Sequence, residues 1–474
     1  MIRRPLVIAL ATAMGLSALM PATAAAEDLL QTYELARDSD PQLSASEASR
    51  LAIKEGAVQT RAAMLPQIDG SASISRSENH QRGNLAVGAD GSIGGGNTQI
   101  DTTTRSSEVR LSQMIYDRGN FTRHKSQKAL SEAADFQLAA AGNDLITRTS
   151  AAYFNVLIAL ESLVAAEAAE TALKKQFDYA SKRLEVGLAP ITDVHEARAQ
   201  YDSARANTIL ARNALEDAYQ GLTELTGKDV RGVKGLPKDF QPVLPESRDA
   251  EGWVATAIEN NPALRAKDLQ VQSTEADVET ARAGHWPRLY LNGSYGDSTG
   301  WGDNTLHDFG FTRDIDNRSY GPAVGVTLSV PIFSGGAVQS GVRQALARRD
   351  VASDEFESQK RALIRNTRNA YQTLVASVSE VEARRLALVS AKSAYDASQV
   401  GLEVGTRTVL DVLQNQRNLF LAQLEYARAR YNHLQNRLLL EQAAGTLDIG
   451  DVQEINRLLT LDTESYVAPG DVQG

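Results

Sequence analysis

The motif Leu184-Glu-Val-Gly187 occurs a second time as Leu402-Glu-Val-Gly405, at an offset of 218 residues. Each copy interrupts a long stretch of helix-compatible sequence, and a helix that ends at glycine and soon restarts is typical of a helical hairpin. The same offset carries flanking residues onto their counterparts, Tyr153 onto Tyr371 and Gly227 onto Gly445. The chain is therefore internally duplicated, and we predict two long helical hairpins with matching tips.

Proline is absent from the segments that we expect to form the hairpin arms. If the first arm is one continuous helix, it is on the order of 100 Å long. The predicted arms are residues 118–186, 191–226, 336–404 and 409–444. The tips then lie near residues 187–193, after Gly187, and near residues 405–411, after Gly405.

A heptad pattern in the last arm indicates how the helices pack. The residues Leu410, Arg417, Leu424, Tyr431 and Leu438 recur every seven positions. Such a stripe is typical of helices that pack side by side, and small residues at positions 165–172 allow close approach on a second face. We expect the helices to pack side by side into a sheet or a tube.

The first 26 residues have the pattern of a secretory signal peptide. Arg3 and Arg4 precede an apolar run at residues 6–19 and a stretch of small residues at 22–26. We expect cleavage after Ala26. A retained membrane anchor is the alternative, but the apolar run is shorter than the roughly 20 residues that a spanning helix needs.

Charge and cysteine content exclude several functions. The chain has 49 basic and 59 acidic side chains, a formal net charge of -10, and no cysteine. The excess of acid argues against nucleic acid as a partner. Without cysteine there is no disulfide, no thiol nucleophile and no thiolate metal site. Any membrane contact must be made by the protein's own side chains.

Proline positions indicate where the two repeats begin. Pro41 breaks a predicted helix at residues 29–63, and Pro262 breaks its counterpart at 253–284. A proline-rich stretch between the halves is suited to an irregular connector. We predict a signal peptide (1–26), a first repeat (27–227), a connector (228–252), a second repeat (253–445) and a C-terminal segment (446–474).

After each opening helix the apolar pattern changes to strict alternation, which predicts strands. The clearest case is Val324, Val326, Leu328 and Val330. We predict strands at residues 68–76, 107–115, 289–295 and 324–330, joined in pairs by polar loops at 83–101 and 297–317. Four strands leave exposed edges, so the sheet needs partners. The fold class is mixed α and β, mainly α.

The sequence contains no pattern that supports catalysis. The histidines are His80, His124, His195, His285, His307 and His433, and no two of them have metal-ligand spacing. The glycine-rich stretch 91–96 precedes no helix, so it is not a phosphate-binding loop. We therefore expect no enzyme activity, no cofactor and no metal.

Polar residues gather at the two predicted tips. Thr192 and Asp193 lie in the first tip, and Arg407 and Asp411 lie in the second. Helix capping and surface charge are one explanation for these residues. The alternative is that acidic side chains from several hairpins converge on a common axis.

Taken together, these features resemble the TolC family of outer-membrane channel proteins, which serve type I protein secretion and drug efflux. The resemblance covers residues 29–447 and includes both duplicated hairpins. It rests on the two tips at 186–194 and 404–412, on Val-Pro-Ile-Phe-Ser-Gly-Gly at 330–336, on Ala-Arg-Ala-Arg-Tyr at 427–431, and on Ala-Ala-Gly-Thr-Leu at 443–447.

The resemblance implies a homotrimer in which four strands from each chain close a β-barrel in the outer membrane of a Gram-negative bacterium, in contact with its lipid. A tube of helices, a trimeric α-barrel, continues across the periplasm. The hairpin tips form an entrance that opens when a periplasmic adaptor protein and an inner-membrane transporter, ABC-type or proton-driven, dock. The implied function is an exit duct. A periplasmic or surface coiled-coil structural protein is the alternative, which the matched strand pairs disfavour.

By position, the resemblance implies that Arg407 bonds near Thr192 of its own chain and to Asp193 of a neighbour, and that Asp411 contributes to a ring of three carboxylates. Two positions depart from the family pattern. Leu402 stands where close relatives have a tyrosine that helps to close the entrance, and Gln414 stands at a second acidic position. We expect fewer polar contacts and less negative charge at this entrance.

Overall fold

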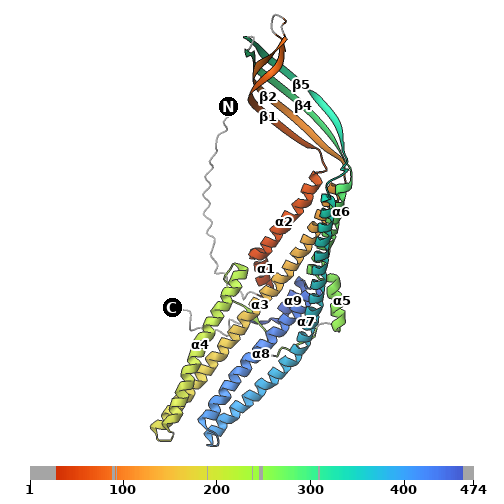
Figure 1. Ribbon diagram of the computed structural model, residues 1–474. Helices are drawn as coiled ribbons and strands as arrows, with labels where there is room; N and C mark the ends of the chain where they lie inside the picture. The colour runs from red at the N-terminus through yellow and green to blue at the C-terminus, as the bar shows by residue number, and fades with distance from the viewer. Residues whose placement is uncertain are drawn as a thin grey trace, which may run out of the picture.

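The computed structural model describes residues 28–87, 91, 93–188, 190–237, 239–244, 249–307 and 310–462. The predicted signal peptide lies outside these residues. Long helices make up most of the molecule, and a sheet extends from one end (Figure 1).

The four hairpin arms are confirmed. They are α3 (Arg118–Glu185) with α4 (Ile191–Thr226), and α7 (Ala337–Glu403) with α8 (Val409–Ala444). Each pair is antiparallel, and both tips lie at the end of the molecule farthest from the sheet (Figure 1). The prediction succeeds because the signals are local: Gly227 and Gly445 end α4 and α8 in the left-handed conformation that glycine adopts without strain.

The proline breaks are also confirmed. The first opening segment consists of α1 (Leu29–Ser39) and α2 (Pro41–Ala62), and the second consists of α5 (Ala250–Asn260) and α6 (Pro262–Arg282), followed by the short 3-10 helix η1 (Ala283–His285). Asp40 and Asn261 cap α2 and α6 by accepting hydrogen bonds from backbone N–H groups. α2 and α4 both pack along α3, so two shorter pieces accompany the long helix.

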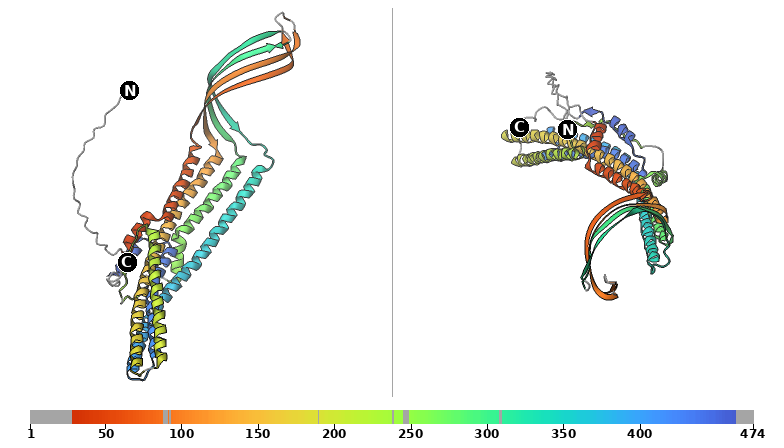
Figure 2. Two further views of the ribbon diagram at one scale, coloured as in Figure 1. Left: turned by 90° about the vertical axis from the view of Figure 1, so that its left-hand side faces the viewer. Right: turned by 90° about the horizontal axis from the view of Figure 1, so that it is seen from above.

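The sheet consists of β1 (Gln67–Val87), β2 (Ile93–Asp117), β4 (Arg288–Leu306) and β5 (Phe311–Ser329), all antiparallel in the order β1-β2-β4-β5. It curves when seen from above (Figure 2). The predicted loops at 83–101 and 297–317 are wrong, because most of these residues belong to the strands. Polar and glycine residues are poor strand formers alone, but here each strand is paired along its length by its neighbour.

The two faces of the sheet differ in chemistry. Cross-strand partners carry their side chains on the same face, and the register therefore assigns every residue to one face. One face, which we call the apolar face, carries exposed side chains such as Val324 (81% exposed) and Val326 (62% exposed). It comprises Ile68, Ile74, Val109, Tyr295, Tyr320, Val324, Val326 and Leu328. The opposite face is polar, with Ser73 bonded to Ser106 at 2.8 Å.

The largest core lies where α1, α3, α4 and α8 meet, about midway along the molecule. Tyr153, Tyr431 and Leu438 are completely or almost completely buried there. Tyr431 and Leu438 belong to the predicted heptad stripe, and their burial confirms the stripe at this level. Leu410, at the tip end of the stripe, is 55% exposed.

The connector crosses this core as mostly irregular chain, and α5 begins at Ala250, inside the predicted connector range 228–252. β3 (Lys234–Gly235) pairs with β6 (Leu461–Asp462), which follows α9 (Ile449–Leu458). The hydroxyl of Tyr153 accepts a hydrogen bond from the N–H of Lys234 at 2.6 Å. The connector and the C-terminal segment are thus tied to each other and to α3.

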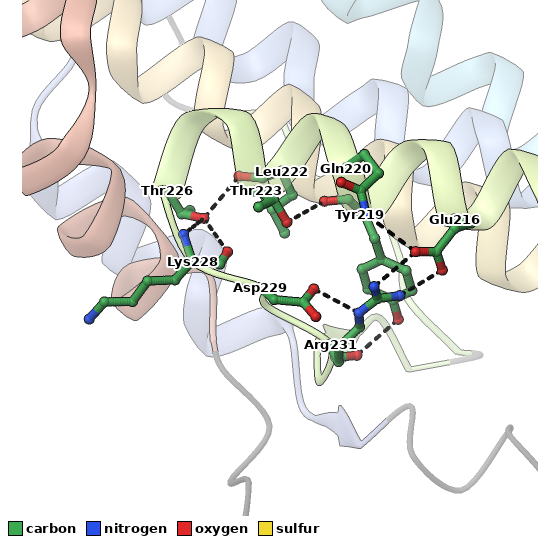
Figure 3. Close-up of polar contacts among 9 residues, drawn as sticks. All are labelled: Glu216, Tyr219, Gln220, Leu222, Thr223, Thr226, Lys228, Asp229 and Arg231. Atoms are coloured by element: carbon green, nitrogen blue, oxygen red, sulfur yellow. Dashed lines mark hydrogen bonds and ion pairs between the residues drawn. The ribbon is translucent and has the colours of Figure 1, made fainter. Parts of the chain in front are cut away.

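The start of the connector is held against the end of α4 (Figure 3). Arg231 donates to both carboxylate oxygens of Glu216 at 2.6 and 2.8 Å, and to Asp229 at 2.7 Å. Its guanidinium lies 5.0 Å from the centre of the Tyr219 ring, and the Tyr219 hydroxyl donates to the Arg231 carbonyl at 2.9 Å. These contacts turn the chain back along α4 immediately after Thr226.

Candidate entrance at the hairpin tips

The first tip closes with a Schellman motif at the end of α3. Gly187 has φ +75°, and its N–H donates to the carbonyl of Leu184 at 2.9 Å. The N–H of Leu188 donates to the carbonyl of Arg183 at 2.8 Å. Two carbonyls that the helix end leaves without partners are thereby satisfied. Arg183 also donates from Nη2 to the Leu188 carbonyl at 3.2 Å.

The second tip repeats this geometry at the end of α7. Gly405 has φ +79°, its N–H donates to Leu402 at 3.2 Å, and the N–H of Thr406 donates to Gly401 at 2.8 Å. Gly401 occupies the position that Arg183 holds in the first tip. A Cβ at Gly401 would lie 2.6 Å from Cγ of Arg407. The glycine therefore leaves space for the Arg407 side chain to lie against α7.

The helix that follows the second tip is capped by a side-chain pair. The Thr408 hydroxyl accepts from the N–H of Asp411 at 3.2 Å, and Oδ2 of Asp411 accepts from the N–H and the hydroxyl of Thr408, both at 2.9 Å. These bonds from Thr408, with the nearby charge of Arg407, lower the pKa of the Asp411 carboxyl. Asp411 is therefore both a helix cap and a charge at the tip.

The first tip has no such cap. Pro190 precedes α4 and provides no side-chain hydrogen bond. Thr192 is exposed and Asp193 is partly exposed. Within the described residues, neither Asp193 nor Arg407 forms a side-chain hydrogen bond or an ion pair with another residue of the chain. The expected Arg407–Thr192 bond is thus not made within this single chain, and the bond to a neighbour's Asp193 stays a prediction.

Both tips are joined by an apolar contact. Leu402 of α7 is 9% exposed and packs in a cluster with residues of the other three hairpin arms: Leu173, Ala204, Val409, Val412 and Leu413. Leu402 therefore contributes apolar burial at the tips. Gln414 is exposed and donates to Asn418 at 3.2 Å.

Sequence reasoning missed Arg183, Gly401 and Thr408. The spacing Thr408-x-x-Asp411 is the signature of a capping box and could have identified the cap. Gly401 could not be found in this way, because its importance depends on a side chain beyond the turn. Among the described residues, no group of three or more histidine, aspartate or glutamate side chains is placed to hold a metal. No described helix is both long and apolar enough to cross a membrane.

Comparison with known proteins shows matches along almost the whole chain. The family model described as "Outer membrane efflux protein" matches residues 32–228 and 253–446. The outer membrane protein TolC of Vibrio cholerae is 32% identical over 91% of this chain and 93% of the relative. The outer membrane protein TolC of Escherichia coli strain K12 is 34% identical over 92% and 85%.

A solved structure of a membrane protein from Pseudomonas aeruginosa has the same fold. The two structures superpose with a TM-score of 0.72, and the match covers 88% of this chain and 90% of that chain at 22% sequence identity. At this sequence identity, the structural similarity is evidence for the fold alone.

Proposed function

The chain belongs to the outer membrane efflux protein family, and we propose that its hairpin tips form the gated entrance of the channel. The resemblance inferred from the sequence is confirmed. The protein is an exit duct for secretion or efflux in the outer membrane of a Gram-negative bacterium, and it extends into the periplasm.

Three chains would complete the channel as a homotrimer. The observation that carries this proposal is the four-stranded sheet, which has an exposed apolar face and free edges at β1 and β5. Joining the β5 edge of one chain to the β1 edge of the next satisfies the backbone groups at both edges, as a membrane requires. The apolar face then contacts lipid and the polar face lines the pore. A coiled-coil structural protein does not need a sheet with an exposed apolar face, so the sheet argues against that alternative.

Channels of this type work in tripartite systems with a periplasmic adaptor and an inner-membrane transporter. We infer that the duct itself is passive, without catalysis or cofactor, and that an ABC-type or proton-driven transporter supplies the energy. Arg407 supports a gate at the tips, because its guanidinium makes no hydrogen bond or ion pair with the described residues of its own chain. In a trimer, a neighbour's Asp193 can supply one.

Loss of this contact should open the entrance. We expect Arg407→Ser to raise the basal conductance of purified channels in planar bilayers, because three weak ion pairs are lost together. Exposed pairs are individually weak and screened by salt, so the difference should shrink at high ionic strength. Arg361→Ser, at an exposed position on α7 far from the tip, serves as control. Equal conductance of Arg407→Ser and the control would show that Arg407 is an ordinary surface charge with no part in closing the entrance.

Asp411 should control ion selectivity and not closure. Because its carboxylate also caps α8, the suitable substitution is Asp411→Asn, which keeps an oxygen for Thr408 and removes the charge. We expect weaker cation selectivity at low salt, since three carboxylates around one axis create a negative potential. Resting conductance should change little. Unaltered reversal potentials in a salt gradient would place Asp411 away from the constriction.

The apolar face can be tested at its centre. We expect Val326→Arg to destabilise the membrane-inserted protein by about 2 to 4 kcal/mol, the cost of arginine at the middle of a lipid-facing surface. Ala323→Arg, on the polar face of the same strand, should insert almost normally. Insertion is measured by the yield of folded protein in outer-membrane fractions. Equal yields for the two variants would contradict the lipid-facing assignment of Val326, and a lower yield for Ala323→Arg would show that the faces are reversed.

A further inference from the structure

The apolar face ends at a definite level along the strands. On β5, outward-facing residues run from Leu328 through Val324 to Tyr320, and the next outward residue is Arg318. About 9 to 11 residues of a tilted strand cross the hydrocarbon core. An apolar stretch of this length ends at Tyr320, on the side of the sheet away from the helices. This level is the outer boundary of the hydrocarbon.

Three arginines lie on the apolar face immediately beyond this boundary. Arg105 and Arg318 are in one row of cross-strand partners, both opposite Thr299, and lie about 10 Å apart across two strand spacings. Arg76 is opposite Thr103 and therefore diagonal to Arg105, at about 7 to 8 Å. All three are exposed. We call Arg76, Arg105 and Arg318 the arginine row.

The members of the arginine row differ in their partners. Arg318 donates to the Asp297 carboxylate and lies 5.3 Å from the centre of the Tyr320 ring, which holds it at the boundary. Arg76 and Arg105 make no hydrogen bond or ion pair from their side chains in the part of the chain that the structure describes. Two guanidinium groups thus face the headgroup level of the outer leaflet without a hydrogen-bonded partner from this chain, and the charge acting on Arg105 is that of Asp297, which is already bonded to Arg318.

Four acidic residues lie on the side of the arginine row that faces away from the hydrocarbon. Glu78, Asp101, Asp303 and Asp314 are successive cross-strand partners and carry four carboxylates on the same face. We call them the acidic row. Like charges opposite each other on a sheet are destabilising, and an anion is repelled from this level. An anion that approaches the apolar face is therefore confined between the hydrocarbon boundary and the acidic row.

We propose that the arginine row binds the phosphate groups of phosphorylated lipid headgroups in the outer leaflet. Guanidinium groups bind phosphate in bidentate fashion. A lipid fits better than free phosphate, because the apolar face directly below the arginines provides a surface for its acyl chains. This inference depends on the sheet lying in the outer membrane. It does not depend on the gate at the tips.

The test is native mass spectrometry of the purified protein in detergent, with diphosphoryl lipid A as the probe. We expect Arg76→Gln/Arg105→Gln to bind it more weakly by about fivefold for each arginine removed, from the energy of a basic residue at an anionic lipid surface. Arg110→Gln is the matched control, because Arg110 is exposed on the polar face of β2, paired with Glu108. It should bind like the unmodified protein.

Two further measurements identify the ligand and the role of the acidic row. Lipid A stripped of both phosphates should bind the unmodified protein as weakly as diphosphoryl lipid A binds the double variant. Glu78→Gln/Asp101→Asn should bind the diphosphoryl form more tightly. Equal binding by the double variant and Arg110→Gln, or equal binding of the stripped lipid, would overturn the proposal. Displacement of the lipid by micromolar inorganic phosphate would assign the row to free anions and also overturn it.

Discussion

Replacing Glu161 on α3 by leucine is expected to lower the free energy of unfolding by about 3 to 5 kcal/mol, because the buried guanidinium of Arg430 then has no carboxylate partner. The Arg430 side chain on α8 is 5% exposed. Its Nη2 donates to the two oxygens of Glu161 at 2.8 and 2.6 Å, and its Nη1 donates to the carbonyl of Pro237 at 3.2 Å. The Tyr431 hydroxyl donates to Glu161 at 2.7 Å. The Glu161–Arg430 pair therefore connects the two hairpins, and Arg430 also connects them to the connector.

A neighbouring ion pair between α3 and α4 is the control. Glu167 pairs with Arg212 at 2.9 Å, but both side chains are about half exposed. Glu167→Leu should change stability by no more than about 1 kcal/mol. The double variant Glu161→Leu/Arg430→Met should recover much of the loss, because no unpaired charge remains. Urea unfolding followed by circular dichroism measures all three. Similar losses for Glu161→Leu and Glu167→Leu would mean that the charge at Arg430 is solvated.

Alanine at Gly445 is expected to cost about 2 to 4 kcal/mol, clearly more than alanine at the equivalent Gly227. Both residues end a hairpin arm in the left-handed conformation, with φ +73° and +66°. A Cβ at Gly445 would lie 2.6 Å from backbone atoms of Asn260 and Asn261, whereas a Cβ at Gly227 would lie 3.3 Å from Cβ of Ser39. The backbone between α5 and α6 cannot move aside as a side chain can.

The two glycines thus form an internal comparison, because conformational strain is common to both and only the contact differs. Gly227→Ala should cost about 1 kcal/mol, the expected loss for a non-glycine residue at this conformation. Gly445→Ala should also weaken the contact between the α5–α6 junction and the end of α8, where Asn261 donates to the Ala443 carbonyl at 3.1 Å. The difference is read from melting temperatures. Equal shifts would contradict the close contact at Gly445.

Much of the helical architecture was predictable because its signals are local. Pro190 and Gly227 bound α4, and Asp40-Pro41 divides α1 from α2, through steric limits that act within a few residues. The strand lengths were not predictable in this way. Thr98 and Gln99 lie in β2, where they pair both with Gln81 and His80 of β1 and with residues of β4 that are more than 200 positions away.

At the tips, too, some features follow from the sequence and others depend on the tertiary structure. The positions of Thr192, Asp193, Arg407 and Asp411 at the tips follow from the duplication and from the glycines that end α3 and α7. That Oδ2 of Asp411 caps α8 was within reach of the sequence, since Thr408 stands three residues before it.

By itself, the sequence determined two hairpins, their ends, four strands and the family, because periodicity, proline and glycine act over short distances. Only the tertiary structure decided that Gly401 leaves space for Arg407 and that Glu161 neutralises Arg430, which lies 269 residues away. It also decided that Arg105 and Arg318 lie in one cross-strand row, with Arg76 diagonal to Arg105. Such contacts depend on strand register and helix packing, which arise from the whole chain and from no single segment of it.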